Sequence, residues 1–152
     1  SSRPGCVPRR GPPMVKTVKA SLVMEPGTLR TDVAVRHHRF SVDEAPPAYD
    51  STDAFPDPYD YILAGLAACT LISIRLSAEA KGIPLERAEV DVSFERRSRA
   101  EPGAQPDHIV RIITLHGELS DAERQKLARS ADCAAFKSLS TGIPITTESA
   151  TP

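Results

Sequence analysis

The sequence has little that would mark a nucleic-acid-binding or membrane protein. It has no Trp, aromatic residues make up 5% of the 152 residues, and the formal net charge is only -1. Nucleic-acid-binding surfaces combine basic patches with stacking aromatic side chains, so this composition argues against such a partner. The longest uncharged stretch runs from Tyr61 to Ile74, between Asp60 and Arg75, and is well short of the ~20 apolar residues that span a bilayer. The sequence therefore predicts a soluble protein with no membrane partner.

Common catalytic and cofactor-binding motifs are also missing. The chain contains no GxSxG, no P-loop and no GxGxxG, which mark serine hydrolases, nucleoside triphosphate sites and dinucleotide sites. Neither CxxC nor HExxH occurs, so a zinc site lacks its usual ligand spacing. The sequence therefore predicts no metal and no cofactor.

The remaining composition is typical of one ordinary domain, with 40% hydrophobic and 26% charged residues. Residues 1–13 are rich in Pro and Arg and predict a disordered leader or a remnant of cloning, while residues 14–152 predict a single domain. The chain has an odd number of cysteines, Cys6, Cys69 and Cys133, and no apolar signal segment follows the leader. These features predict a cytoplasmic protein with reduced thiols.

Hydrophobic periodicity predicts an α+β fold with an antiparallel sheet. Short β-rich segments at 15–24, 29–35 and 39–42 predict a meander of two or three strands, followed by a proline-rich loop at 45–58. The second half predicts, in order, strands at 86–97 and 108–119, a helix after the Ser120–Glu123 capping box, a helical turn at 134–139 ended by Gly142, and a last strand at 143–147.

The longest predicted element is a helix from Tyr59 to about Lys81. Asp57 is a suitable N-cap, Pro58 suits the first turn, and Gly82 is a typical C-terminal stop. The middle of this helix is apolar on nearly every face, which predicts a helix buried all round at the centre of the fold.

Two cysteines and one basic segment are the candidates for chemistry. Cys69 lies in the apolar helix, and Cys133 lies where a helix restarts, so that the helix dipole would lower the pKa of its thiol. Taken alone, Cys69 fits a cysteine that only packs in the core better than a reactive one, whereas Cys133 fits either interpretation equally well. The segment Arg36-His37-His38-Arg39 either aims an arginine at a thiolate or forms a solvated edge. On a strand its adjacent histidines would point to opposite faces and could not share a metal.

Several segments resemble the OsmC/Ohr family, named for osmotically inducible protein C and organic hydroperoxide resistance proteins. Residues 58–70, PYDYILAGLAACT, resemble the first cysteine helix of that family, and residues 131–140 resemble its second cysteine region. Residues 38–44 and 117–120 match two further family segments, so the resemblance covers about residues 15–150. It implies an α+β fold in which two subunits intertwine, each with an antiparallel sheet, a long buried central helix and a second helix.

The resemblance further implies thiol-dependent reduction of hydroperoxides, preferentially organic ones. Cys69 would be the thiolate that attacks the peroxide, become a sulfenic acid, and form a disulfide with Cys133 that an external dithiol reductant reopens. Arg39, or else Arg36, would hold the thiolate, and Asp60 is the candidate carboxylate for orienting that arginine. The implied protein is a homodimeric, cytoplasmic antioxidant enzyme of the oxidative stress response.

Two other functions remain open from the sequence. The second motif is Cys133-Ala134-Ala135-Phe136 where the family usually has C-P-V-H or C-P-Y-S, and the Gly-Gly usual before the first helix is missing. These departures favour a dimer that binds a small apolar or acidic ligand. A third hypothesis is a thiol sensor that forms the Cys69–Cys133 disulfide without catalytic turnover. Kinship of fold does not decide among the three.

Overall fold

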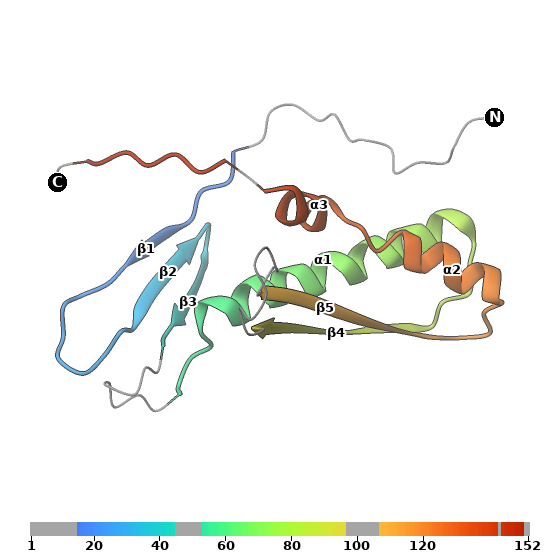
Figure 1. Ribbon diagram of the computed structural model, residues 1–152, viewed down its shortest axis with the longest axis horizontal. Coiled ribbons are helices and arrows are strands. Elements are labelled where there is room, and N and C mark those ends of the chain that lie inside the picture. Colours follow the sequence, from blue (N-terminus) through green and yellow to red (C-terminus); the bar gives the residue numbers. More distant parts are fainter. Residues whose placement is uncertain (1–14, 45–52, 97–106, 143, 151–152) are drawn as a thin grey trace, which may run out of the picture. The chain divides into compact units, whose positions relative to one another are not determined.

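A computed structural model describes residues 15–44, 53–96, 107–142 and 144–150 (Figure 1). The chain divides into two compact units, residues 1–62 and residues 63–152. The leader expected at 1–13, with Cys6, lies outside the described residues, as do residues 45–52 of the loop expected at 45–58 and residues 97–106. The single domain over residues 14–152 stays a prediction.

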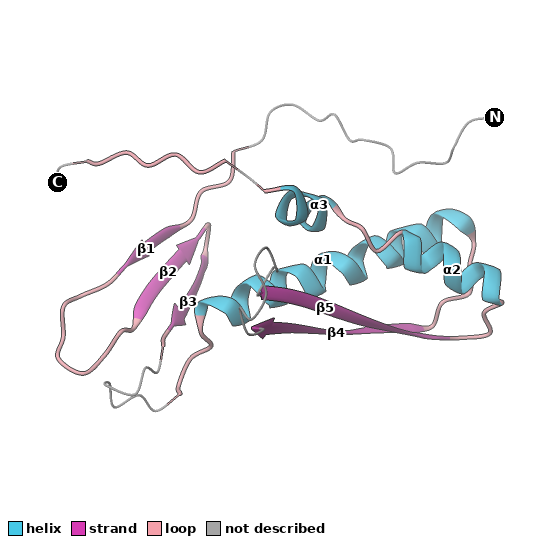
Figure 2. Ribbon diagram, in the orientation of Figure 1, coloured by secondary structure: helices cyan, strands magenta, loops and turns pink. Residues whose placement is uncertain are grey.

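The first unit contains a three-stranded antiparallel sheet in the order β1-β2-β3 (Figure 2). The strands are β1 (Lys19–Ser21), β2 (Thr31–Val35) and β3 (His38–Val42), which confirms the predicted meander. Arg36 and His37 form the two-residue turn between β2 and β3, with Arg36 at φ 51°. Because the turn interrupts the strand, the two adjacent histidine rings lie side by side, with centroids 3.9 Å apart. The prediction that they point to opposite faces is wrong.

Helix α1 (Pro58–Lys81) starts in the first unit and continues through the second. Asp57 and Asp60 each accept the other's backbone amide through a carboxylate oxygen at 2.9 Å, a reciprocal cap at the start of the helix. At the other end Gly82 takes φ +63° and Ile83 donates its amide back to the last helical turn, as in a Schellman motif. Both predicted ends of the helix are confirmed.

The first turn of α1 packs on β3 within the first unit. The Tyr61 hydroxyl donates to the Ser41 carbonyl at 2.9 Å, and the Tyr61 ring centroid lies 4.9 Å from that of Phe40. An aromatic contact and a hydrogen bond therefore anchor the beginning of the helix to the sheet.

The second unit pairs α1 with a long antiparallel hairpin and two short helices (Figure 1). These elements are β4 (Arg87–Arg96), β5 (Asp107–His116), α2 (Asp121–Arg129) and α3 (Ala134–Thr141). The predicted capping box is present, because the Ser120 hydroxyl accepts the Glu123 amide while the Glu123 carboxylate accepts the Ser120 amide. No strand forms in residues 144–150, so the last predicted strand is wrong there, since those residues have no ladder partner.

The core of the second unit lies under one face of α1. Buried α1 residues recur every four positions: Leu66, Thr70, Ile74 and Ala78. Ile74 and Ala78 pack with Leu127 and Ala131, and around them pack Ile83, Leu85, Ala88, Ile113, Leu115 and Leu119. Ile72 and Leu76, on other faces of the helix, are 59% and 53% exposed. The predicted burial on all sides is therefore wrong for the single chain, because the hairpin and α2 cover only one face.

By length and composition alone, the 24-residue helix α1 would pass as a membrane span. The expectation that the protein has no membrane partner therefore stays a prediction. The core helix of a soluble protein passes the same test, and the contacts of Ile74 with α2 are those of a core helix. One such helix is weak evidence for a membrane protein.

Candidate thiol site

Cys69 and Cys133 lie together in the second unit and form a disulfide. Their Cα atoms are 6.2 Å apart although 64 residues separate them in sequence, a distance usual for bridged cysteines. Cys69 lies in the middle of α1 and is half-buried, whereas Cys133 immediately precedes α3 and is buried. The fold thus makes a dithiol pair from two of the three cysteines.

Cys133 is also the N-cap of α3, which confirms the predicted helix restart. Its backbone is extended at φ -73° and ψ 171°, and its sulfur accepts a hydrogen bond from the Phe136 amide at 3.5 Å. Its carbonyl accepts the Lys137 amide at 3.0 Å.

A partly buried arginine from β5, Arg111, joins the segments that carry the two cysteines. Arg111 donates from Nη1 to the Thr70 Oγ1 at 2.9 Å and to the Ala131 carbonyl at 3.0 Å. Its Nη2 donates to the Asp132 carboxylate at 2.9 Å, and its Cζ lies 4.1 Å from the centroid of the Phe136 ring. Thr70 directly follows Cys69 in the sequence, and Asp132 directly precedes Cys133. The guanidinium therefore bonds to a sequence neighbour of each cysteine.

Sequence reasoning missed Arg111, although one signal pointed to it. The predicted alternation in β4 is confirmed, because Ala88, Val90, Val92 and Phe94 are half-buried while the residues between them are exposed. Arg111 pairs with Val92, and cross-strand partners share a face of the sheet, so the arginine lies on the apolar side. On β5 it stands between Ile109 and Ile113 in the same alternating row. A charged residue at a position where the alternating pattern of the strand calls for an apolar one is the signal that could have identified Arg111.

The other predicted site residues lie in the first unit. Arg36 occupies the turn after β2, and Arg39 lies in β3, where its Nη1 donates to the His38 carbonyl at 3.3 Å. Asp60 caps α1. Because Cys69 belongs to the second unit, the roles expected for these two arginines and this carboxylate stay predictions.

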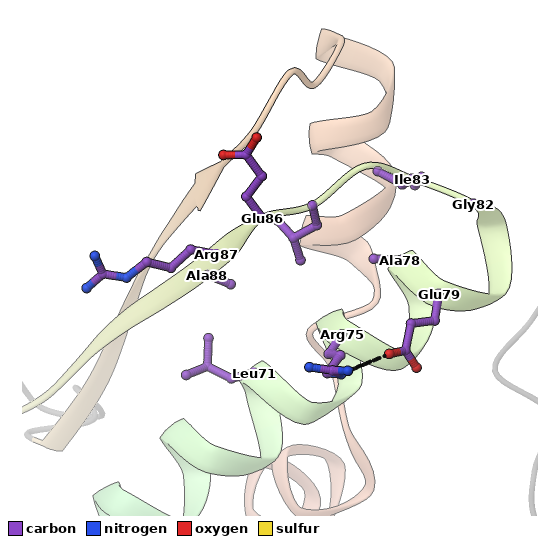
Figure 3. A pocket seen from close by; sticks show the side chains of 10 residues that line it. Leu71, Arg75, Ala78, Glu79, Gly82, Ile83, Glu86, Arg87 and Ala88 are labelled. Carbon is purple, nitrogen blue, oxygen red and sulfur yellow. Dashed lines mark hydrogen bonds and ion pairs between the residues drawn. The ribbon is translucent and has the colours of Figure 1, made fainter.

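A cavity of about 480 Å³ opens where the end of α1 meets the start of β4 (Figure 3). Arg75 and Glu79 pair on its helical side at 2.8 Å, and Glu86 and Arg87 come from the strand side. Neither cysteine of the disulfide lines it. In the described part of the chain, no group of three or more His, Cys, Asp or Glu side chains is placed to hold a metal ion.

The sequence pattern described as OsmC-like protein matches residues 51–148, which is more than half of the chain. The chain belongs to the OsmC-like family. The predicted family is thereby confirmed, and membership supports a redox role in peroxide resistance. OsmC/Ohr proteins are soluble, which agrees with α1 being a core helix. No curated protein matches this OsmC-like protein.

Solved structures of the family have the same fold. An OsmC-like protein from Mycoplasma pneumoniae is 22% identical with a TM-score of 0.67, covering 84% of this chain and 88% of its own. The organic hydroperoxide resistance protein OsmC from Legionella pneumophila is 19% identical, with a TM-score of 0.57 and coverage of 83% and 89%. OhrB of Bacillus subtilis, an organic hydroperoxide resistance protein, is 17% identical, with a TM-score of 0.55 and coverage of 80% and 89%. These likenesses confirm the predicted OsmC-like α+β fold.

Proposed function

We propose that this OsmC-like protein reduces organic hydroperoxides through Cys69 and Cys133. The observation that carries the proposal is the disulfide between these two residues, which are distant in sequence. Likeness in fold to the hydroperoxide resistance proteins of Legionella pneumophila and Bacillus subtilis supports the same chemistry.

The proposed reaction has two steps at sulfur. The Cys69 thiolate attacks the peroxide, so that an S–O bond forms, the O–O bond breaks, and the alkoxide takes up a proton and leaves as an alcohol. The Cys133 thiolate then attacks the sulfenic sulfur; the S–S bond forms, the S–O bond breaks, and the departing hydroxide takes up a proton and leaves as water. An external dithiol supplies two electrons and two protons and restores both thiols.

The burial of the two cysteines supports this division of roles. Cys69 is half-buried and is the more exposed of the pair, as a residue that meets a peroxide must be. Cys133 is buried at 6% exposure and needs to reach only the partner sulfur. Arg39, with Arg36 as the other candidate and Asp60 as its orienting carboxylate, would supply positive charge near the reacting sulfur.

The proposal includes a homodimer in the cytoplasm. Ile72 and Leu76 on α1, together with Ile112 on β5, leave large apolar side chains more than half exposed in the single chain. Exposed large apolar side chains on these two elements are typical of a surface that a partner covers, and a second copy of the chain is the partner proposed. A cytoplasmic location keeps both cysteines available as thiols.

The test is to treat the reduced protein with one equivalent of cumene hydroperoxide, measure the intact mass and count the thiols. The expected result is a loss of two hydrogens, mapped by digestion to Cys69–Cys133. Steady-state consumption of the peroxide with dithiothreitol should follow, and Cys69→Ser should abolish it. Cys6→Ser is the matched control and should retain it.

The alternatives give different results. A Cys69→Ser variant as active as the parent would refute the proposal outright. Formation of the disulfide without sustained peroxide consumption would favour the thiol sensor. An unchanged mass with both thiols free would favour the ligand-binding dimer, and native mass spectrometry of freshly purified protein would then be expected to detect a bound small molecule.

A further inference from the structure

We propose that Arg111 is a positioning residue that holds the Cys133 segment, residues 131–136, against α1. The Cys133 thiol is thereby kept close to the sulfur of Cys69, where the sulfenic acid forms. The inference deepens the proposed function and rests on it for the identity of the oxidised sulfur. It concerns a residue that contacts the neighbours of both cysteines.

The Thr70 hydroxyl is fixed from two sides. It donates to the Leu66 carbonyl at 2.8 Å and accepts from Arg111 Nη1 at 2.9 Å, and Thr70 is fully buried. The hydroxyl therefore has one orientation and presents a lone pair to the guanidinium. This contact ties Arg111 to α1 at the residue after Cys69.

The Ala131 carbonyl ties the same guanidinium to the second cysteine. It accepts from Arg111 Nη1 at 3.0 Å and from the Cys133 amide, also at 3.0 Å. One oxygen thus fixes both the arginine and the backbone of the cysteine. Asp132 accepts from Nη2, and the Phe136 ring of α3 lies under the guanidinium, so the segment is held before and after Cys133.

Arginine suits this role because its planar guanidinium presents several donors in a rigid arrangement. Its side chain is 14% exposed, so the charge is largely removed from water and needs these partners. Among the residues that the structure describes, no buried side-chain nitrogen or oxygen lacks a hydrogen-bond partner. None of these contacts of Arg111 involves the sulfur of Cys69 or Cys133. The network is therefore expected to persist when the disulfide is reduced.

If Arg111 positions the two segments in this way, the effective concentration of the Cys133 thiol at Cys69 is high. In a glutathione redox buffer, the equilibrium between dithiol and disulfide reports this effective concentration directly and needs no peroxide. A residue that only stabilises the fold would change the free energy of unfolding and leave this equilibrium nearly unchanged. A positioning residue must shift it.

The experiment compares Arg111→Gln with the parent protein in buffers of graded glutathione ratio. We expect the effective concentration to fall about tenfold, because several charge-assisted hydrogen bonds to the Cys133 segment are lost. Arg111→Lys should recover part of it, since an ammonium keeps the charge but not the fork geometry. The matched control is Arg124→Gln, which removes a half-buried arginine that binds the carbonyls of Leu115 and Gly117, away from the thiols.

The kinetic counterpart separates the two chemical steps. With one equivalent of cumene hydroperoxide, Arg111→Gln should release alcohol at the parent rate but form the disulfide about tenfold more slowly. The sulfenic acid on Cys69 should then accumulate and be trapped by dimedone. If Arg111→Gln does not fold, Asp132→Asn provides the test, because that side chain is half exposed, and we expect a fall of about threefold.

An effective concentration within twofold of the parent in folded Arg111→Gln would overturn the inference, and so would an equal fall in Arg124→Gln. If Asp132→Asn is used instead, an effective concentration equal to that of the parent would also overturn the inference. If the parent shows no peroxide turnover but Arg111→Gln alone shifts the glutathione equilibrium, the positioning role stands and only the peroxidase proposal fails.

Discussion

Replacement of Ile74 by Ala should reveal how much the single buried face of α1 contributes to stability. Ile74 is fully buried and packs against Leu127 of α2 and against Ala131, which follows that helix. Deleting a buried Ile side chain to Ala costs about 2–5 kcal/mol, from lost apolar burial and from the cavity that remains. Because its neighbours include the small side chains of Ala78 and Ala131, which cannot fill the space, we expect about 3–4 kcal/mol here.

The assay is urea unfolding of the reduced protein, followed by circular dichroism at two protein concentrations. Ile72→Ala is the control on the same helix, because that side chain is mostly exposed in the single chain. At the lower concentration it should cost within about 0.5 kcal/mol of zero. A loss below about 1 kcal/mol for Ile74→Ala would refute the assignment of the core to this face. A loss for Ile72→Ala that appears only at the higher concentration would support the second copy.

Two further substitutions test local features of the second unit. A Cβ at Gly117, which has φ +137°, would lie 2.6 Å from the Pro84 carbonyl oxygen, so Gly117→Ala should lower stability by more than about 1 kcal/mol in urea unfolding; an unchanged midpoint would contradict this contact. The His116 hydrogen bond, followed by the charge of Arg87, lowers the pKa of Glu89 below its ordinary value of 4.5. Stability from this carboxylate is therefore present above pH 4.5 and lost as pH falls through the lowered pKa, so the deficit of Glu89→Gln should shrink from pH 7 to pH 3. A deficit that is constant over this range would contradict it.

The ends of the helices followed from local chemistry. Asp57, Gly82 and the Ser120 capping box act through backbone groups within one turn, so their neighbours in sequence are sufficient to predict them. The alternation of β4 was equally local. The last strand, expected near residues 143–147, depended instead on a partner strand, and the described residues there have none.

The burial of α1 was harder to predict because the middle of the helix carries apolar side chains on nearly every face. Hydrophobic pattern alone cannot say how many faces one chain covers, and only packing of the hairpin and α2 selected the stripe from Leu66 to Ala78. Likewise, the alternation expected at the two adjacent histidines failed because a turn residue, Arg36, adopted a left-handed φ.

The sequence by itself determined the family, the order of strands and helices as far as the last helix, and the two candidate cysteines, because these depend on neighbouring residues and on recognisable segments. Only the tertiary structure decided that Cys69 and Cys133 meet, since no property of a 64-residue separation predicts a Cα distance of 6.2 Å. It alone also brought Arg111 between their segments. The reason is physical: a guanidinium finds its partners through space, and here they come from α1, the loop before Cys133, and α3.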